Sequence, residues 1–379
     1  MFHRFKNGVK RMMNFLNNMN LLPKNFIVAN IVEVLKEDPE NGVEKLYEMS
    51  KSLITDEQVK SMIRQIKDYY DTHASIKRYI KNMIYNTNKT CLNHFLQNIA
   101  VKELWEGLSL RQEMVQKYQV HIPHALVINI GMNCSLYRKG CLCQSDPNMA
   151  MPLSEISRLI HEAREIGIHL IVITGGDPFI NDSLVKVYQK YDDVEFIVTT
   201  TGLSLTEQRC GALSKLGNVL PLVILEGMDK EIKQWTNAVT YQQIISSLDK
   251  LKAHGILFGV LTPTKRSNFK LVTSDDFILP LIRKGSRLNW YVTSHHEQEV
   301  EQLDKKELAE LDGHLSFIRQ TRPYVTLRLE SQNPLICRCS VGPLCFNYDV
   351  NGQKNQFIFP QLSMKNSQNR SLIQVLHHI

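Results

Sequence analysis

The sequence predicts an α/β protein, a partial (β/α)6 TIM-like barrel with an all-helical N-terminal domain before it and a short C-terminal extension after it. Apolar residues first recur at helical spacing, and six short apolar runs then alternate with amphipathic helical stretches. None of these runs is followed by the GxGxxG motif of a dinucleotide-binding sheet. We therefore expect domains at residues 1–118, 119–322 and 323–379.

The helical domain is expected over residues 1–118. Apolar residues fall three and four apart in IVANIVEVLKED, VEKLYEMSKSLI and DEQVKSMIRQIKDYYD, and DPENG forms a turn between the first two. Residues 2–22 combine the same spacing with basic residues and no acid. Such a helix suits weak contact with a membrane surface or docking on the protein's own core. We favour docking, because apolar stripes on helices usually face a core.

The barrel is expected to contain six strands with helices between them. The predicted strands are ALVINI (125–130), HLIVIT (169–174), VEFIVTTT (194–201), VLPLVIL (219–225), ILFGVLT (256–262) and LNWYVT (288–293). The predicted helices are SEISRLIHEAREIG, SLVKVYQKY, TEQRCGALSKL, YQQIISSLDKLKAHG and DDFILPLIRKG. Continuous apolar strands that alternate with helices indicate a parallel sheet with crossover helices.

Composition limits the class of protein. The chain has 379 residues, 43% of them hydrophobic, which is enough for a large core. No apolar run approaches the length of a membrane span, and residues 1–30 lack the features of a signal peptide, so we expect a cytoplasmic protein. The net charge of +7 is modest, and basic residues are not interleaved with aromatic ones. We therefore expect no nucleic-acid partner.

The eight cysteines divide into two groups and two single residues. One group is Cys134, Cys141 and Cys143, the other is Cys337, Cys339 and Cys345, and the single residues are Cys91 and Cys210. In a reducing compartment, clustered cysteines are more often metal ligands or redox groups than disulfides. We expect the two single cysteines to be buried or half-buried thiols without a chemical role.

Unusual residues follow the predicted strands at their carboxyl ends. GMNCSLYRKGCLC follows the first strand, GGDPF the second, TTTG closes the third and LEG the fourth. In a barrel of parallel strands these loops meet at one face, where the chemistry of such folds lies. A tight turn would account for GGDP or EG alone. Three thiols on one loop are not explained by a turn, and they indicate a metal site.

Together these segments resemble the radical SAM superfamily from about Leu126 to Val292. The resemblance rests on the cysteine loop, ITGGDPF (173–179), TTTG (199–202), LEG (225–227) and GVLTPTKRSNFKLVTSDDFI (259–278). It implies an enzyme that binds a [4Fe-4S] cluster and S-adenosylmethionine (SAM) and generates a 5'-deoxyadenosyl radical. This radical abstracts hydrogen from an unknown substrate, whether a small molecule, a lipid or a peptide, and an electron donor is then required.

The resemblance also implies roles for individual residues. Cys134, Cys141 and Cys143 would ligate the cluster, and the remaining iron would hold SAM. Gly175, Gly176 and Asp177 would meet the amino group of the methionine moiety, because glycines allow close backbone approach and an acid accepts hydrogen bonds from a cation. Thr201 and Glu226 would lie near the ribose.

The cysteine loop departs from the family's CxxxCxxC spacing. The second cysteine position is occupied by Arg138, and the spacing here is CxxxxxxCxC. One interpretation is a remodelled loop in which Cys143 supplies the third thiolate. The alternative is a catalytically silent relative, in which the barrel persists as a nucleotide-binding or protein-binding module. The family's GGE acid is also shortened here to Asp177.

The C-terminal extension resembles the SPASM/twitch-like auxiliary-cluster segment of one subgroup. DVNGQKNQFIFP (349–360) is similar to its motif, but the expected cysteine falls at Phe357. Cys337, Cys339 and Cys345 are the candidate auxiliary ligands, unless they are merely buried thiols. A zinc site on the first loop would need a fourth ligand, and the nearest histidine, His124, lies at the wrong end of the first strand. His295 and His296 follow the sixth strand and are expected to be solvated or to face the substrate.

Overall fold

A computed structural model of the chain describes most of its residues. The described ranges are 24–53, 57–131, 150–229, 241–294, 301–333, 336–340, 347–348, 354–355, 357–362 and 367–377. Residues 2–22, for which a surface helix was predicted, lie outside these ranges, as does the whole of the first cysteine loop.

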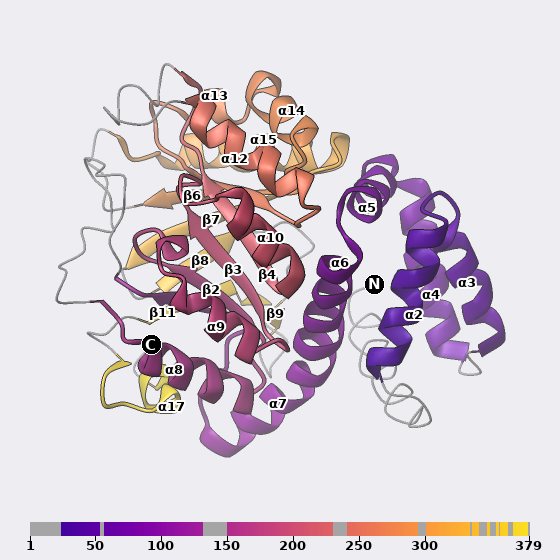
Figure 1. Cartoon of the computed structure of the whole chain (residues 1–379), viewed down its shortest axis with the longest axis horizontal. Helices are drawn as coiled ribbons and strands as arrows, with labels where there is room; N and C mark the ends of the chain where they lie inside the picture. Colours follow the sequence, from indigo (N-terminus) through magenta and orange to yellow (C-terminus); the bar gives the residue numbers. More distant parts are fainter. Residues whose placement is uncertain are drawn as a thin grey trace.

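The chain is helical from residue 24 to residue 118 wherever it is described, as its apolar spacing predicts. The elements are α2 (Lys24–Glu37), α3 (Gly42–Leu53), α4 (Glu57–Thr72), α5 (Ala74–Asn86), α6 (Lys89–Phe95), the π-helix η1 (Leu96–Glu106) and α7 (Gly107–Tyr118). Helices α2, α3 and α4 stand apart from the barrel, whereas α6, η1 and α7 run along it (Figure 1). No helix within the described ranges is long and apolar enough to cross a membrane.

Seven neighbouring parallel strands form the barrel, so the predicted fold class is confirmed. They are β1 (Leu126–Asn129), β2 (Leu170–Thr174), β3 (Glu195–Thr200), β4 (Val219–Ile224), β5 (Gly259–Pro263), β6 (Leu288–Ser294) and β7 (Val325–Asn333). The first six strands coincide with the predicted apolar runs. The seventh begins just after the expected boundary at residue 322, and it continues the parallel order beside β6.

The C-terminal segment closes the ring of strands. Strand β8 (Ile336–Ser340) pairs antiparallel with both β7 and β11 (Phe357–Leu362), and β11 pairs parallel with β1. A further antiparallel pair consists of β9 (Asn347–Tyr348) and β10 (Lys354–Asn355). Residues near the C-terminus therefore complete the sheet next to its first strand, which the pattern of the first six strands did not predict.

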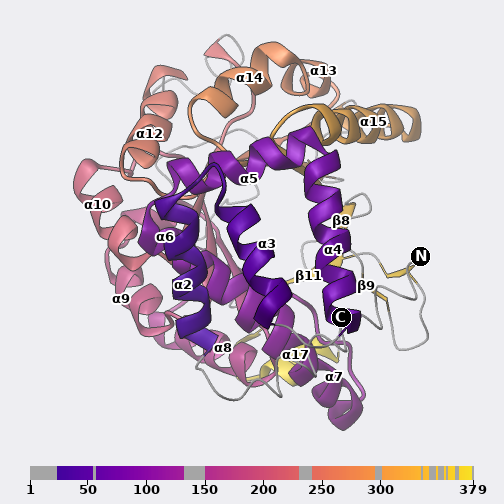
Figure 2. The same cartoon turned by 90° about the vertical axis from the view of Figure 1, so that its right-hand side faces the viewer.

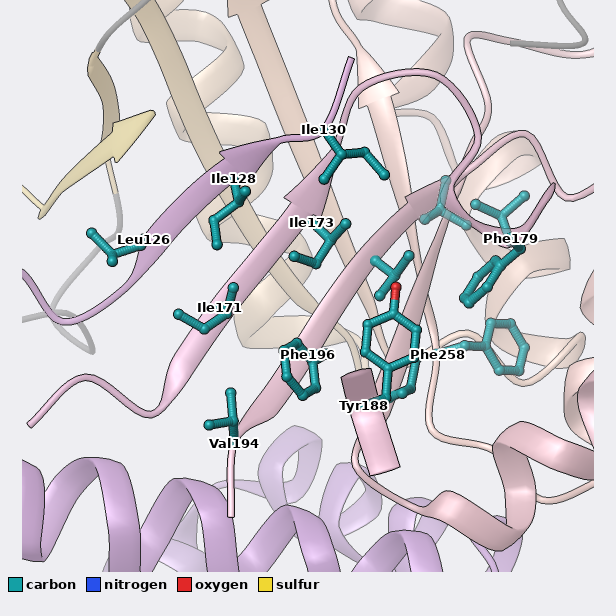
Figure 3. Close-up of a cluster of buried hydrophobic side chains, with 14 of the residues drawn as sticks. Leu126, Ile128, Ile130, Ile171, Ile173, Phe179, Tyr188, Val194, Phe196 and Phe258 are labelled. Atoms are coloured by element: carbon teal, nitrogen blue, oxygen red, sulfur yellow. The ribbon is translucent and has the colours of Figure 1, made fainter. Parts of the chain in front are cut away.

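Helices cover the outside of the barrel. They are α8 (Leu153–Glu165), α9 (Ser183–Lys190), α10 (Glu207–Leu216), α12 (Tyr241–Ala253), α13 (Phe269–Val272), α14 (Asp275–Arg283), α15 (Lys305–Thr321) and α17 (Leu372–Leu376). Alternate strand residues form the main core beneath them, and Figure 3 shows two rows of this core along β1 and β2. Tyr188 of α9 packs against Phe196 of β3, with their ring centroids 4.9 Å apart.

The other face of the strands forms a second, smaller core inside the ring. Its members include Val172, Ile197, Leu222 and Trp290, which alternate with the outward-facing residues of their strands. Met83 of α5 and Phe95 of α6 pack against this cluster. The N-terminal helices therefore cover the amino ends of the strands (Figure 2).

A buried ion pair fastens these helices to the barrel. The guanidinium of Arg111 lies 2.7 Å from Glu103 Oε1, and both side chains are almost fully buried. Glu103 Oε2 accepts a hydrogen bond from the backbone N of His169, which precedes β2 (2.8 Å). Arg111 Nη1 also donates to the backbone O of Gly167. Removing either partner would leave an uncompensated buried charge, so the pair holds η1 and α7 in position.

A second carboxyl group is buried at the amino end of β3. Glu195 occupies an inward position two residues before Ile197, and it is only 2% exposed. Asn98 Nδ2 of η1 donates to Glu195 Oε2 over 3.4 Å. Burial raises the pKa of Glu195 to about 8, and the hydrogen bond from Asn98 only partly offsets this effect. Glu195 is therefore protonated in the folded protein at neutral pH.

We predict that Glu195→Gln removes a pH dependence of stability. The carboxyl pKa is about 8 in the folded state and 4.5 as the unperturbed value. Its stabilising contribution is therefore complete below pH 4.5 and is lost as the pH rises towards 8. The glutamine variant lacks this loss, so its stability relative to the wild type should rise across that window by roughly 1.4 kcal/mol per pH unit at most, and should level off above pH 8. Denaturant titrations at several pH values measure the difference.

Glu165→Gln is the control, because the Glu165 side chain is exposed. It should show little pH-dependent difference from the wild type. An equally flat profile for Glu195→Gln would mean that Glu195 is ionised in the folded protein.

Candidate functional site

The segment with the first three cysteines leaves and rejoins the described chain at the carboxyl end of β1. The backbone N of Ile130 donates to Thr174 O (2.8 Å), and the backbone N of Met151 donates to Ile130 O (2.9 Å). Both ends of the segment are therefore held beside the end of β2. Cys134, Arg138, Cys141 and Cys143 themselves lie outside the described residues.

The turn after β2 approaches the end of β1 very closely. Gly175 and Gly176 have positive φ angles of 95° and 74°, a conformation that favours glycine. A Cβ atom on Gly175 would overlap Asn129 Oδ1 and would lie 2.8 Å from the backbone N of Gly131. Both the conformation and the available space therefore require glycine at position 175.

Asp177, the third residue of this turn, is completely buried. Its carboxylate accepts hydrogen bonds from Thr200 Oγ1 (2.8 Å), Thr201 Oγ1 (2.6 Å), Ser204 Oγ (3.0 Å) and the backbone N of Phe179 (3.3 Å). We call these five residues the Asp177 cluster. It brings together two residues singled out from the sequence, Asp177 and Thr201, through a direct hydrogen bond between their side chains.

Polar side chains line the inside of the barrel just below this turn. Asn129, Thr174 and Thr199 occupy inward positions at the carboxyl ends of β1, β2 and β3. Thr199 Oγ1 donates to Thr174 Oγ1 over 3.0 Å, which joins two neighbouring strands. Sequence reasoning quoted Thr174, Thr199 and Thr200 only as members of ITGGDPF and TTTG and gave them no role, and it did not single out Asn129 or Ser204. The run of hydroxyl residues around TTTG, at a strand end, was the available signal.

Glu226 follows β4 at the same end of the barrel and is half-buried. Its backbone O accepts a hydrogen bond from Asn268 Nδ2 (2.9 Å), and the same amide group donates to Pro263 O (2.9 Å). Asn268 thus fixes the end of β4 against the end of β5. Strands β3 and β4 are neighbours in the sheet. Glu226 therefore lies at the carboxyl end of the strand next to β3, whose following turn contributes Thr201 and Ser204 to the Asp177 cluster.

Cys91, Cys210 and His124, which the sequence analysis also considered, lie within the described residues. Cys91 and Cys210 are buried, as predicted, and burial raises the pKa of each thiol to about 11. His124 precedes β1, where Nδ1 lies 3.2 Å from Glu103 Oε1 at the amino end of the barrel. Within the described ranges, no three or more His, Cys, Asp or Glu side chains form a group that could hold a metal ion.

The candidate auxiliary ligands are only partly described. Cys337 and Cys339 lie on β8, and the sheet register sets Cys339 opposite Phe357 of β11. Phe357 is the position at which the resemblance expects a cysteine, so that position is adjacent to a cysteine in the sheet. Cys345, His295 and His296 lie outside the described residues.

The mouth of the barrel combines a glycine turn, hydroxyl groups and one carboxylate. Backbone carbonyl groups of a glycine turn can accept hydrogen bonds from an ammonium group, and the carboxylate of Glu226 can accept them from hydroxyls. Such groups can accept hydrogen bonds from a polar ligand.

Comparison with known proteins identifies relatives of the barrel. The model of the Radical SAM superfamily matches residues 133–264. GTP 3',8-cyclase of Clostridium perfringens (strain SM101 / Type A) is 28% identical over 159 residues, which are 39% of this chain and 49% of that protein. The probable GTP 3',8-cyclase of Archaeoglobus fulgidus is 26% identical over 123 residues, 32% of this chain and 40% of that protein. The chain therefore spans about half the length, or less, of these curated relatives.

Solved structures show the same fold. Streptococcus suis SuiB bound to the precursor peptide SuiA aligns with 72% of this chain and 69% of its own, with a TM-score of 0.50 and 14% sequence identity. SuiB without that peptide aligns with 72% of this chain and 70% of its own, with the same TM-score and identity. At this identity the likeness concerns the fold.

We predict that Gly175→Ala destabilises the protein by roughly 2–4 kcal/mol. The positive φ angle is unfavourable for alanine, and its methyl group would overlap the Asn129 amide. Gly211→Ala is the control, since Gly211 lies in helix α10 and a methyl group there would have His254 Cε1 as its nearest neighbour, at 3.7 Å. The control should gain up to about 1 kcal/mol from helix propensity. Equal effects of the two substitutions in chemical denaturation would contradict the close approach described here.

Proposed function

The chain belongs to the radical SAM superfamily through residues 133–264, and from this premise we propose that it binds a [4Fe-4S] cluster and SAM for radical chemistry. Members of this superfamily bind both groups. The proposed ligands of the cluster are Cys134, Cys141 and Cys143. The observation that carries the proposal is that their segment leaves and rejoins the sheet at Ile130, beside the glycine turn of Gly175 and Gly176.

The residues present fit these groups chemically. Three thiolates suffice for a cluster whose remaining iron is open to SAM. The positive φ angles of Gly175 and Gly176 turn peptide groups at the mouth without any intervening side chain. With one electron from an external donor, these groups would supply a 5'-deoxyadenosyl radical for hydrogen abstraction.

The chain's own residues bind and orient the reacting groups. We propose that the turn at Gly175 and Gly176 receives the methionine amino group, and that Thr201 and Glu226 lie towards the ribose. The apolar core inside the ring closes the barrel below this level. The side chain of Asn268 donates a hydrogen bond to the backbone O of Glu226. This bond fixes the backbone at the end of β4.

The proposed substrate remains broad. It is a small molecule, a lipid or a peptide, and an electron donor is required for turnover. The fold neighbour SuiB was crystallised with a precursor peptide, which supports a peptide as one candidate. We further propose a cytoplasmic location. Residues 2–22 would either dock on the protein's own core or make weak contact with a membrane surface. Cys337, Cys339 and Cys345 are the proposed ligands of any auxiliary cluster.

Arg138 favours a second candidate function. A guanidinium does not deprotonate in proteins and cannot replace a thiolate as an iron ligand. If the loop has lost its cluster, the barrel serves as a nucleotide-binding or protein-binding module without catalysis. This candidate keeps the glycine turn and the Asp177 cluster, because neither depends on iron.

We predict that anaerobic loading with iron and sulfide leaves about four irons per chain. Low-temperature EPR of the reduced protein should show a cluster signal that SAM perturbs. Replacing Cys134, Cys141 and Cys143 by serine should abolish iron retention, whereas Cys210→Ala should not, because that thiol is buried in the core. A wild-type protein that retains no iron would rule out the radical enzyme.

Arg138→Cys separates the two interpretations of the loop. A silent relative should gain iron on acquiring a third thiol at the family's spacing. A loop that already uses Cys143 should gain little, and its iron content should stay near that of the wild type. Iron and sulfide assays of both proteins after identical loading measure the change.

A further inference from the structure

The acid of the glycine turn is enclosed by protein groups instead of facing the mouth of the barrel. Asp177 has no exposed surface, and each of its carboxylate oxygens accepts two hydrogen bonds. We propose that Asp177 is a positioning residue, which joins the turn after β2 to the turn after β3 and does not itself contact the amino group of SAM. This inference rests on the proposed function, since it concerns how the SAM site is built.

The hydrogen bonds fill the accepting capacity of the carboxylate. An ionised carboxylate offers about four lone-pair sites. Oδ1 accepts from Thr200 Oγ1 and the backbone N of Phe179, and Oδ2 accepts from Thr201 Oγ1 and Ser204 Oγ. An ammonium group could reach Asp177 only by displacing one of these donors from a site without solvent.

The Asp177 cluster also fixes the backbone of the turn after β3. Thr200 Oγ1 also accepts a hydrogen bond from the backbone N of Gly202 (3.1 Å), and Thr201 Oγ1 accepts one from the backbone N of Leu203 (3.3 Å). Each threonine hydroxyl therefore connects the carboxylate to a turn amide. Gly202 has a φ angle of 84°, and a Cβ atom there would lie 2.5 Å from Ser247 Oγ. At Gly202 the turn after β3 therefore packs closely against Ser247 of α12.

The same enclosure accounts for aspartate in place of the family's glutamate. The side chain of Asp177 reaches its four donors in a site with no exposed surface. One more methylene would push the carboxylate into Thr200 and Thr201 or force both turns apart. Hence Asp177→Glu, although it restores the family's residue, should weaken the site.

Thr200 provides the discriminating substitution. It is completely buried, and it lies on the same face of β3 as Val198, a member of the outer core beneath the helices. Thr200 therefore does not face the mouth, and it can influence SAM only through Asp177 and Gly202. Thr200→Val removes the hydroxyl at nearly constant volume, and Thr200→Ser retains it.

We expect Thr200→Val to weaken SAM binding about ten-fold, because the turn after β3 loses the hydrogen bonds that Thr200 Oγ1 makes with Asp177 and with the backbone N of Gly202. The binding is measured by equilibrium dialysis of SAM with the iron-loaded protein. Hydrogen exchange of the SAM-free protein should show faster exchange at Gly202 and Leu203. Thr200→Ser should restore both properties, and Asp177→Glu should reduce SAM affinity.

Thr206→Val controls for a general loss of stability. Thr206 Oγ1 caps helix α10 by accepting from the backbone N of Arg209 (3.2 Å), and it is not a member of the Asp177 cluster. Its loss should cost about 1 kcal/mol of stability without altering SAM affinity. Unchanged SAM affinity in Thr200→Val, or improved affinity in Asp177→Glu, would overturn the positioning role. A wild-type protein that binds no SAM would instead refute the proposed function, and the exchange rates would still decide whether Asp177 orders the second turn.

Discussion

A carboxylate buried without solvent is the constraint on which the candidate site depends. An ionised group in a protein interior is tolerated only when hydrogen bonds or charges replace its hydration. Asp177 obtains that replacement from three hydroxyl groups and one amide, which belong to the end of β3 and to the turns after β2 and β3. These turns consequently cannot move independently. The shape of the glycine turn, the position of Thr201 and the conformation at Gly202 all follow from this burial.

The two ends of the barrel differ in their chemistry. At the amino ends of the strands, Glu103 of η1, Arg111 of α7 and the protonated Glu195 of β3 are buried. At the carboxyl ends, polar residues face inwards above an apolar core. Burial at one end secures the helical domain, whereas the described polar residues of the candidate site gather at the other end.

The two departures from the family pattern have different physical consequences. Asp177 is one methylene shorter than the family's glutamate. The three hydroxyl groups around it lie within hydrogen-bond distance of this shorter side chain. The change to Arg138 replaces a metal ligand by a cation, and Cys143 is the thiol that could take over as the third ligand. The proposed contacts to SAM and the proposed ligands of the cluster therefore lie on different segments of the chain.

The sequence by itself determined the described helices of the N-terminal domain, the six barrel strands and the end of the barrel at which Asp177 and Thr201 lie. These features follow from local periodicity and from the parallel order of strands such as β2 and β3, which short-range patterns express. Tertiary structure alone decided that β8 and β11 close the ring and that Thr200 and Ser204 enclose Asp177. Such contacts join residues far apart in the chain, and their formation depends on strand register and on the burial of a charge. Strand register and the burial of Asp177 cannot be read from a local sequence pattern, because they arise only when the whole barrel packs.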